Sequence, residues 1–267
     1  MLIGIRDDCV TGTCLESKMA AIKDCGADFV ELVVKPQMLE ELSGSETDDG
    51  RYYPKEALRR LNRAVANTGL PIRTVSYSNI GEYMQKSPEE RAAVQRELIQ
   101  CVNLASAVGA GAILLATCEF EQDFTKVAAT FKADLRPALD LALEKNIRLC
   151  FEPVWRYPTS LVTMLVRAIE HPAAYVYYDM GNCLHFGEDP VEALLDCIAH
   201  VGAVHIKPAP GREMDLAEMP LSGILNILKE GAFSGVGVLE MNGGEDNKVL
   251  HDAIVILDKL GWRCGSC

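Results

Sequence analysis

The sequence predicts an α/β protein built as a single-domain (β/α)8 barrel, the TIM barrel. Eight short apolar runs alternate with longer helical patterns along the whole chain, beginning with a run and ending with a helical pattern. None of the runs alternates cleanly between polar and apolar residues, which is typical of parallel strands buried on both faces. A length of 267 residues suits one barrel of this kind.

The expected strands are rich in Val, Ile, Leu and aromatic residues. In chain order they are 2–6, 28–34, 71–77, 111–118, 147–153, 174–180, 202–208 and 235–241. An open, doubly wound sheet is the alternative, but no G-x-G-x-x-G motif follows the first run. Since no shift in composition divides the chain, residues 1–267 are expected to form one domain. The polar insertion 42–54 is expected to be a loop after the second strand.

The helices between the strands have recognisable ends. In the longest of them, Ser87 is the expected N-cap, Pro88 occupies the first helical position and Glu90 completes a capping box. Gly109 is expected to end the same helix, because glycine adopts the left-handed conformation found at helix C-termini.

The charge balance narrows the classes of partner. A formal net charge of −12 and a pI near 4.9 disfavour a nucleic-acid surface, because such surfaces use Lys and Arg to neutralise phosphates. Arg6, Asp7 and Asp8 stand where an export signal needs an apolar stretch. The longest apolar run, 109–118, is far too short to span a bilayer. We therefore expect neither a nucleic-acid nor a membrane partner.

Ten cysteines raise the question of disulfide bonds. Half of them lie inside apolar patterns, where a thiol behaves as a small hydrophobic side chain: Cys25, Cys101, Cys118, Cys150 and Cys197. Reduced thiols and a cytoplasmic location are therefore predicted. Cys264 and Cys267 form a C-x-x-C without a second ligand pair or a following helix, and we interpret them as part of a frayed tail.

Four consecutive strands are expected to end near side chains that can bind a metal. These residues are Glu152, Asp179, His205 and Glu240, on the fifth to the eighth strand. The C-terminal ends of the strands meet at one mouth of such a barrel, so these side chains should converge. A single His in a barrel strand would usually be a hydrogen-bonded core residue. The repetition over four strands is what indicates a site.

Three carboxylates and an imidazole would be unfavourable to bury together without a cation. A buried, unpaired carboxylate is strongly disfavoured, and neighbouring carboxylates raise each other's pKa. A divalent cation turns this repulsion into coordination. Mixed oxygen and nitrogen ligands suit Mn²⁺, Mg²⁺, Co²⁺ or Zn²⁺ better than metals that prefer sulfur. We predict that these four residues hold one divalent metal ion, with Mn²⁺ favoured.

The pattern of these residues resembles the xylose isomerase-like barrels, which include sugar phosphate isomerases, ketose 3-epimerases and hydroxypyruvate isomerase-like proteins. Those proteins place Glu, Asp, His and Glu at the ends of strands 5 to 8. Here 26 residues separate Asp179 from His205 and 35 separate His205 from Glu240, similar to the ketose 3-epimerases. The resemblance covers essentially the whole chain, and three stretches carry it: 26–34, 104–115 and 178–209.

The resemblance implies a small carbohydrate substrate and a reaction that begins with removal of a proton beside a carbonyl. The metal would polarise the carbonyl, and one glutamate would take the proton to give an enediolate. Return of the proton by the same glutamate to the neighbouring carbon is isomerisation. Delivery of a proton by the opposite glutamate to the other face is epimerisation. Glu152 and Glu240 are therefore the expected catalytic pair of a metal-dependent isomerase or epimerase acting on a sugar or sugar phosphate.

Three basic residues near the mouth are expected to bind the substrate. Lys207 lies two residues after His205, so its side chain should point the same way, although it could also reach solvent. Arg156 follows the fifth strand and Arg212 the seventh, where either could hold a phosphate or carboxylate. Three positions depart from the family pattern: Asn182 stands in place of a His, Pro208 in place of an acid, and Arg212 one residue late.

Other functions remain open from the sequence. A dehydratase acting on a keto-polyol such as an inosose begins with the same proton abstraction and differs in the leaving group. An endonuclease IV-like DNA-repair nuclease would need further His ligands, but the first four expected strands contain none. A non-catalytic binding protein is a third alternative, which four intact ligands disfavour. The sequence does not name the sugar, and it leaves open whether the chain forms a homo-oligomer.

Overall fold

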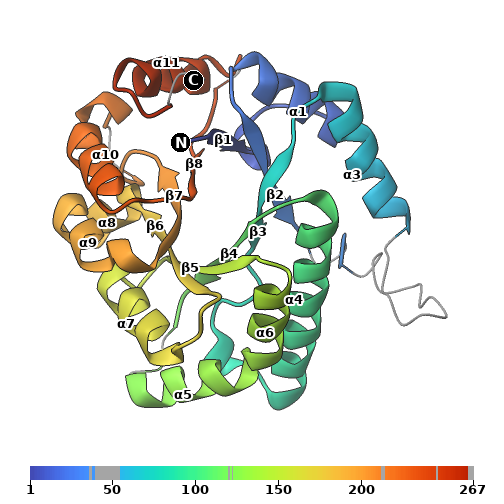
Figure 1. Ribbon diagram of the computed structural model, residues 1–267, viewed down its shortest axis with the longest axis vertical. Helices are drawn as coiled ribbons and strands as arrows, with labels where there is room; N and C mark the ends of the chain where they lie inside the picture. The colour runs from blue at the N-terminus through green and yellow to red at the C-terminus, as the bar shows by residue number, and fades with distance from the viewer. Residues whose placement is uncertain are drawn as a thin grey trace.

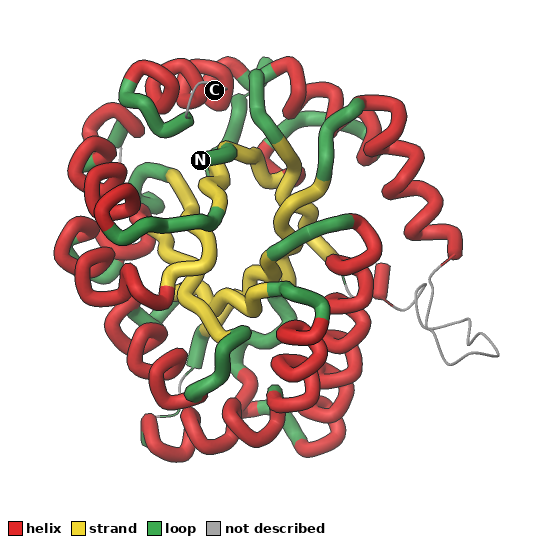
Figure 2. The backbone as a smooth tube through the Cα atoms, viewed as in Figure 1, coloured by secondary structure: helices red, strands yellow, loops and turns green. Residues whose placement is uncertain are grey.

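Eight parallel strands close into a barrel in the order in which they occur in the chain, and β1 pairs with β8. The computed structural model describes residues 1–35, 38–39, 55–119, 121, 123–211, 214–244 and 246–263. Figure 1 and Figure 2 show the strands at the centre and the helices around them. The predicted (β/α)8 barrel is confirmed. That residues 1–267 form a single domain stays a prediction, because part of the chain is not described.

The observed strands lie within two residues of the predicted runs at both ends. They are β1 (Ile3–Arg6), β2 (Phe29–Val34), β3 (Ile72–Tyr77), β4 (Ala112–Thr117), β5 (Arg148–Pro153), β6 (Ala174–Asp179), β7 (Val201–Ile206) and β8 (Val236–Leu239). Side chains fill the interior of the barrel, where Ala112, Leu114, Cys150, Tyr177 and Ala203 pack together. The strands are therefore buried on both faces, as their continuous apolar runs predict.

The helices form the outer layer. They are α1 (Leu15–Asp24), α3 (Lys55–Thr68), α4 (Pro88–Val108), α5 (Phe124–Asp134), α6 (Arg136–Glu144), α7 (Thr159–Ile169), α8 (Met180–His185), α9 (Pro190–Cys197), α10 (Leu221–Glu230) and α11 (Lys248–Lys259). The predicted capping box of α4 is confirmed. Glu90 N–H donates to Ser87 Oγ at 3.2 Å, and Ser87 N–H donates to the Glu90 carboxylate at 2.7 Å. Gly109 ends the helix with a φ of 77°.

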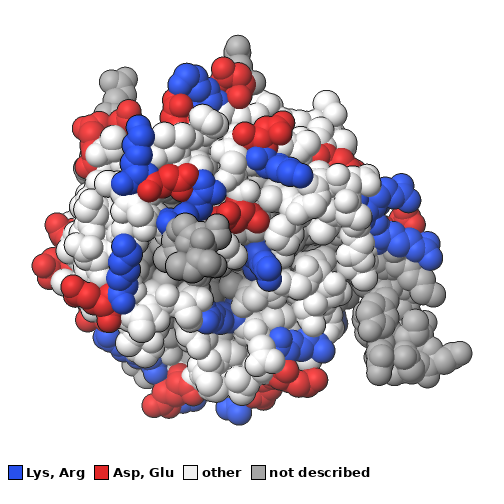
Figure 3. Space-filling model, turned by 45° about the horizontal axis from the view of Figure 1, so that its top comes forward, with Lys and Arg blue, Asp and Glu red and all other residues white. Residues whose placement is uncertain are grey.

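The two ends of the described chain lie side by side, because the Met1 amino group donates to the Trp262 carbonyl at 3.0 Å. The described cysteines are free thiols, and the five expected to lie in apolar patterns are buried. Cys264, Cys267 and the insertion 42–54 lie outside the described residues. None of the described helices has the length and apolar character needed to cross a membrane. On the face drawn in Figure 3, Lys and Arg side chains are scattered among acidic and uncharged residues.

Candidate active site

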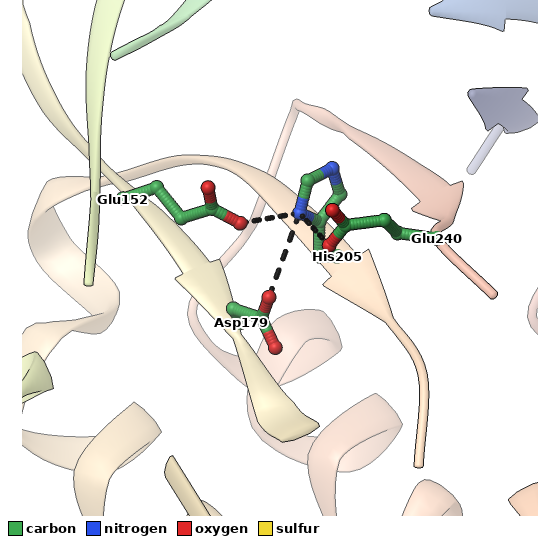
Figure 4. A group of neighbouring side chains, drawn as sticks. All are labelled: Glu152, Asp179, His205 and Glu240. Atoms are coloured by element: carbon green, nitrogen blue, oxygen red, sulfur yellow. Dashed lines mark hydrogen bonds and ion pairs between the residues drawn. The ribbon is translucent and has the colours of Figure 1, made fainter. Parts of the chain in front are cut away.

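The C-terminal ends of β5 to β8 bring four side chains together. Glu152 is the penultimate residue of β5, Asp179 the last residue of β6, His205 the penultimate residue of β7, and Glu240 follows β8 directly. One potential ligand atom from each residue lies within 4.8 Å of all the others. Figure 4 shows the four side chains pointing toward one another. The four residues expected to converge are therefore adjacent, while their role as metal ligands stays a prediction.

His205 Nδ1 is the common neighbour of the three carboxylates. It lies 2.6 Å from Glu152 Oε1, 3.0 Å from Glu240 Oε2 and 3.6 Å from Asp179 Oδ2. Asp179 and His205 are register partners between β6 and β7, which places their side chains next to each other. Glu152, Asp179 and His205 are buried, and the Glu240 side chain is 15% exposed. The group is thus buried, and Glu240 is the member that lines the cavity at the mouth.

Asp179 is fixed by the start of the next helix. Its Oδ1 accepts the Asn182 N–H at 2.8 Å, which makes Asp179 the N-cap of α8. The Asn182 side chain donates to the Pro153 carbonyl at 2.8 Å and so ties this turn to the end of β5. The second oxygen, Asp179 Oδ2, is buried and accepts no hydrogen bond of normal geometry from the described residues. This oxygen forms an ion pair with Lys207 Nζ at 2.7 Å, and its position among the other potential ligand atoms fits a bound cation.

Lys207, the residue after β7, points into the same group, as its position two residues after His205 predicts. Its Nζ lies 2.7 Å from Asp179 Oδ2 and 2.6 Å from Glu240 Oε2. Burial alone would lower the pKa of Lys207, but Asp179 and then Glu240 raise it, so the side chain stays charged. The glycine at position 181 leaves room for the Lys207 side chain, because a Cβ on residue 181 would lie 2.7 Å from Lys207 Cγ.

Burial and neighbouring charges move the pKa values of the two glutamates in opposite directions. Burial raises the pKa of Glu152 to about 7, although His205 opposes this. Burial would also raise the pKa of Glu240, but His205, followed by Lys207 and Arg6, lowers it well below its usual value. Without a bound metal, the Glu152 carboxyl therefore holds its proton more tightly than the Glu240 carboxyl does. Such a separation is typical of acid–base pairs.

Two further charged residues of this region lie on β1 and β2, for which the sequence predicts no site residue. Glu31 of β2 is fully buried, and its Oε1 lies 2.9 Å from His205 Nε2. Arg6, the last residue of β1, forms an ion pair with Glu240 and hydrogen bonds of 2.7 and 2.8 Å with Asp8. The sequence signal for Glu31 is an acid in the middle of an otherwise apolar strand. The signal for Arg6 is a charge at the end of the first strand.

A cavity of about 570 Å³ opens at the mouth, between the loops that follow β1, β7 and β8. Its polar lining includes Arg6, Asp8, Thr11, Lys207, Glu240 and Asn242. This volume suits a small molecule. Arg156 is exposed in the loop after β5 and is not among the described lining residues. Arg212 lies outside the described residues.

Comparisons with known proteins agree on the family. Residues 19–260 match the family model of the xylose isomerase-like TIM barrel. The chain is 24% identical over 245 residues to L-ribulose-5-phosphate 3-epimerase UlaE of Salmonella heidelberg (strain SL476), covering 86% of this chain and 83% of the relative. The structure of 3-keto-D-glucoside 4-epimerase YcjR from E. coli superposes with a TM-score of 0.77 at 16% identity, over 97% of this chain and 99% of the other.

A second solved structure, D-psicose 3-epimerase from Clostridium cellulolyticum H10, gives a TM-score of 0.74 at 15% identity, over 98% of this chain and 99% of the other. At such identities the structures show a shared fold. All three relatives are epimerases, which are isomerases, the enzyme class that the sequence predicts for this chain. The family model spans most of the chain, and the chain therefore belongs to the xylose isomerase-like TIM barrel family.

Proposed function

We propose that this chain is a divalent-metal-dependent isomerase or epimerase of a keto-sugar or keto-sugar phosphate. The observation that carries the proposal is the placement of two glutamates. Glu152 and Glu240 approach His205 Nδ1 from opposite sides, at 2.6 and 3.0 Å (Figure 4). A substrate bound between them would have a carboxyl group on each side, which proton transfer on both faces of a carbon requires. Membership of the family and the epimerase relatives support the same reaction class.

The proposed metal ligands are Glu152, Asp179, His205 and Glu240. Three carboxylate oxygens and one imidazole nitrogen suit Mn²⁺, which we favour, and also Mg²⁺, Co²⁺ or Zn²⁺. The burial of Asp179 and the close approach of three carboxyl groups to one imidazole support a cation at this point. When bound, the cation would act as a Lewis acid toward a substrate carbonyl.

The side chains of the protein carry the proton transfers. One glutamate accepts the proton from the carbon between the carbonyl and the adjacent hydroxyl, leaving an enediolate. The same glutamate returns it to the neighbouring carbon in an isomerisation. In an epimerisation the opposite glutamate, which starts protonated, gives its own proton to the other face of the carbon, and the first glutamate keeps the proton that it removed. Lys207 Nζ, 2.6 Å from Glu240 Oε2, keeps that carboxyl ionised and can donate to a substrate hydroxyl. Arg156 and Arg212 are proposed to bind the distal end of the substrate.

Hydrogen exchange in D₂O tests the reaction. A suitable substrate panel is L-ribulose 5-phosphate, D-psicose and a 3-keto-D-glucoside, together with their stereoisomers. Each compound is incubated with the enzyme in D₂O, with and without Mn²⁺, and deuterium is located by NMR. We expect metal-dependent incorporation at the carbon next to the carbonyl or at its neighbour for at least one compound.

Variants of the two glutamates distinguish the mechanisms. Glu240→Gln should lower epimerisation by about 10²–10⁴-fold while sparing exchange at the carbon that Glu152 reaches. Glu119→Gln is a matched control, because Glu119 is also a buried glutamate but accepts hydrogen bonds from backbone N–H groups. It should keep the wild-type rate. The proposal fails if no ketose, aldose or sugar phosphate shows metal-dependent exchange. Loss of water from a cyclic or acidic keto-polyol would identify a dehydratase instead.

A further inference from the structure

Glu31 connects His205 to Tyr177 inside the barrel. Its Oε1 lies 2.9 Å from His205 Nε2, and the Tyr177 hydroxyl donates to its Oε2 at 2.6 Å. All three side chains are fully buried, and the rings of Tyr177 and His205 lie 4.4 Å apart. Each carboxylate oxygen of Glu31 therefore faces one side chain that can donate a hydrogen bond.

The barrel closure creates this arrangement. Tyr177 precedes Asp179 by two residues on β6, so it points to the same inner face one layer deeper in the barrel. β2, which carries Glu31, neighbours neither β6 nor β7 in the barrel order. Glu31 therefore reaches both partners across the interior. A carboxylate buried so deeply needs such donors, because an unpaired one is strongly disfavoured.

We propose that Glu31 is a positioning residue for the metal site, and this inference rests on the proposed function. Glu31 accepts the Nε2–H of His205, so that Nδ1 is the nitrogen directed at Glu152, Asp179 and Glu240. The hydrogen bond at one imidazole nitrogen determines which nitrogen can bind a metal. A carboxylate that accepts the remaining N–H of a histidine ligand fixes the ring and strengthens the metal bond. Tyr177 in turn holds the Glu31 carboxylate in place.

The hydrogen bonds that Glu31 accepts from His205 and Tyr177 distinguish a positioning role from simple packing. If Glu31 only filled space, Gln would replace it with little effect on the site, because the two side chains have nearly the same shape. Gln lacks the charge that strengthens the hydrogen bond to His205 Nε2–H, and its amide group needs an acceptor where the carboxylate now accepts from Tyr177. The substitution therefore changes the orientation of His205 while conserving volume.

The experiment compares four metal-free proteins: the wild type, Glu31→Gln, Tyr177→Phe and the control Glu119→Gln. Zn²⁺ affinity is measured by competition with a chromophoric chelator, and folding by circular dichroism. Glu31→Gln should weaken Zn²⁺ binding by about 10–100-fold, and Tyr177→Phe by a smaller factor. Glu119→Gln should bind as the wild type does.

NMR of the Zn²⁺-loaded proteins, labelled with ¹⁵N at histidine, gives a readout that simple packing would not move. The wild type should show a His205 Nε2-bound proton at low field that exchanges slowly with water. In Glu31→Gln this signal should move upfield or disappear into exchange.

The Zn²⁺ affinities of the variants decide whether Glu31 positions His205. A folded Glu31→Gln protein with wild-type Zn²⁺ affinity overturns it. If that variant does not fold, Tyr177→Phe decides instead: weaker binding supports the inference and unchanged binding overturns it. A wild-type protein that binds no Zn²⁺, Mn²⁺, Mg²⁺ or Co²⁺ overturns the proposed function as well. That result is distinct from one in which the wild type binds and Glu31→Gln binds equally well.

Discussion

Two buried carboxyl groups near the ends of neighbouring strands face very different surroundings. Glu119, two residues beyond β4, accepts hydrogen bonds from the backbone N–H groups of Tyr83 and Met84 at 2.7 and 3.2 Å. Glu152, at the end of β5, faces His205 and the other carboxylates of the candidate site. Burial raises the pKa of each glutamate to about 7. The same pKa shift therefore accompanies two different roles.

The partners of a buried acid distinguish a structural role from a functional one. The backbone N–H groups that meet Glu119 can only donate, so this carboxyl fixes the short turn Tyr83–Gln85. The partners of Glu152 are side chains that can gain or lose a proton or bind a metal. A displaced pKa thus points to a functional site when the neighbouring groups can also change their state.

The largest expected effect is the loss of metal binding from the candidate site. Asp179→Asn removes the charge of a buried carboxylate, and His205→Ala removes the imidazole nitrogen from the four proposed ligands. Each should weaken Mn²⁺ binding by more than about 100-fold, beyond the effect typical of residues behind the ligands. Calorimetric titration of the metal-free protein measures this, with Glu119→Gln expected to match the wild type. Full metal occupancy of both variants in elemental analysis would show that the ligand assignment is wrong.

A second prediction concerns the pH dependence of stability at Glu119. The pKa of this carboxyl is about 7 in the folded protein against an ordinary value of 4.5, so the folded state holds the proton more tightly. The resulting stabilisation is present below about pH 4.5 and is lost as the pH rises toward 7. From about pH 5 to about pH 8, the wild type should lose roughly 2 kcal/mol of unfolding free energy relative to Glu119→Gln.

Urea unfolding of both metal-free proteins at the two pH values measures the difference. Parallel pH dependence in the two proteins would contradict the prediction. It would mean that the backbone hydrogen bonds of Glu119 compensate for its burial.

The smallest expected effect comes from Lys207, whose ammonium group lies where it opposes a bound cation. It is 2.7 Å from Asp179 Oδ2 and 2.6 Å from Glu240 Oε2. Lys207→Met should tighten Mn²⁺ binding by about tenfold, because it removes a like charge beside the metal. Lys86→Met, which removes a charge near Glu119, is the matched control and should leave Mn²⁺ affinity unchanged. Unchanged binding in Lys207→Met would mean that Lys207 moves away freely when the metal enters, and weaker binding would mean that Lys207 supports the metal site.

Local patterns in the sequence were enough to predict the barrel and to select four side chains for its mouth. Strand limits agree within two residues because continuous apolar runs and their flanking turns depend on neighbours in the chain. The capping box at Ser87 and Glu90 is equally local. Glu152, Asp179, His205 and Glu240 could be grouped because all parallel strands end on the same side of a barrel.

Contacts across the barrel could not be predicted in this way. Glu31 meets His205, and Arg6 meets Glu240, because the closure and stagger of eight strands set those distances. The apolar pattern within one strand carries no information about its distance from another strand across the interior. The place of Arg156 in its exposed loop is equally independent of local periodicity, because a loop takes its conformation from tertiary contacts. The sequence thus specifies which residues reach the mouth, and the closed barrel specifies which of them touch.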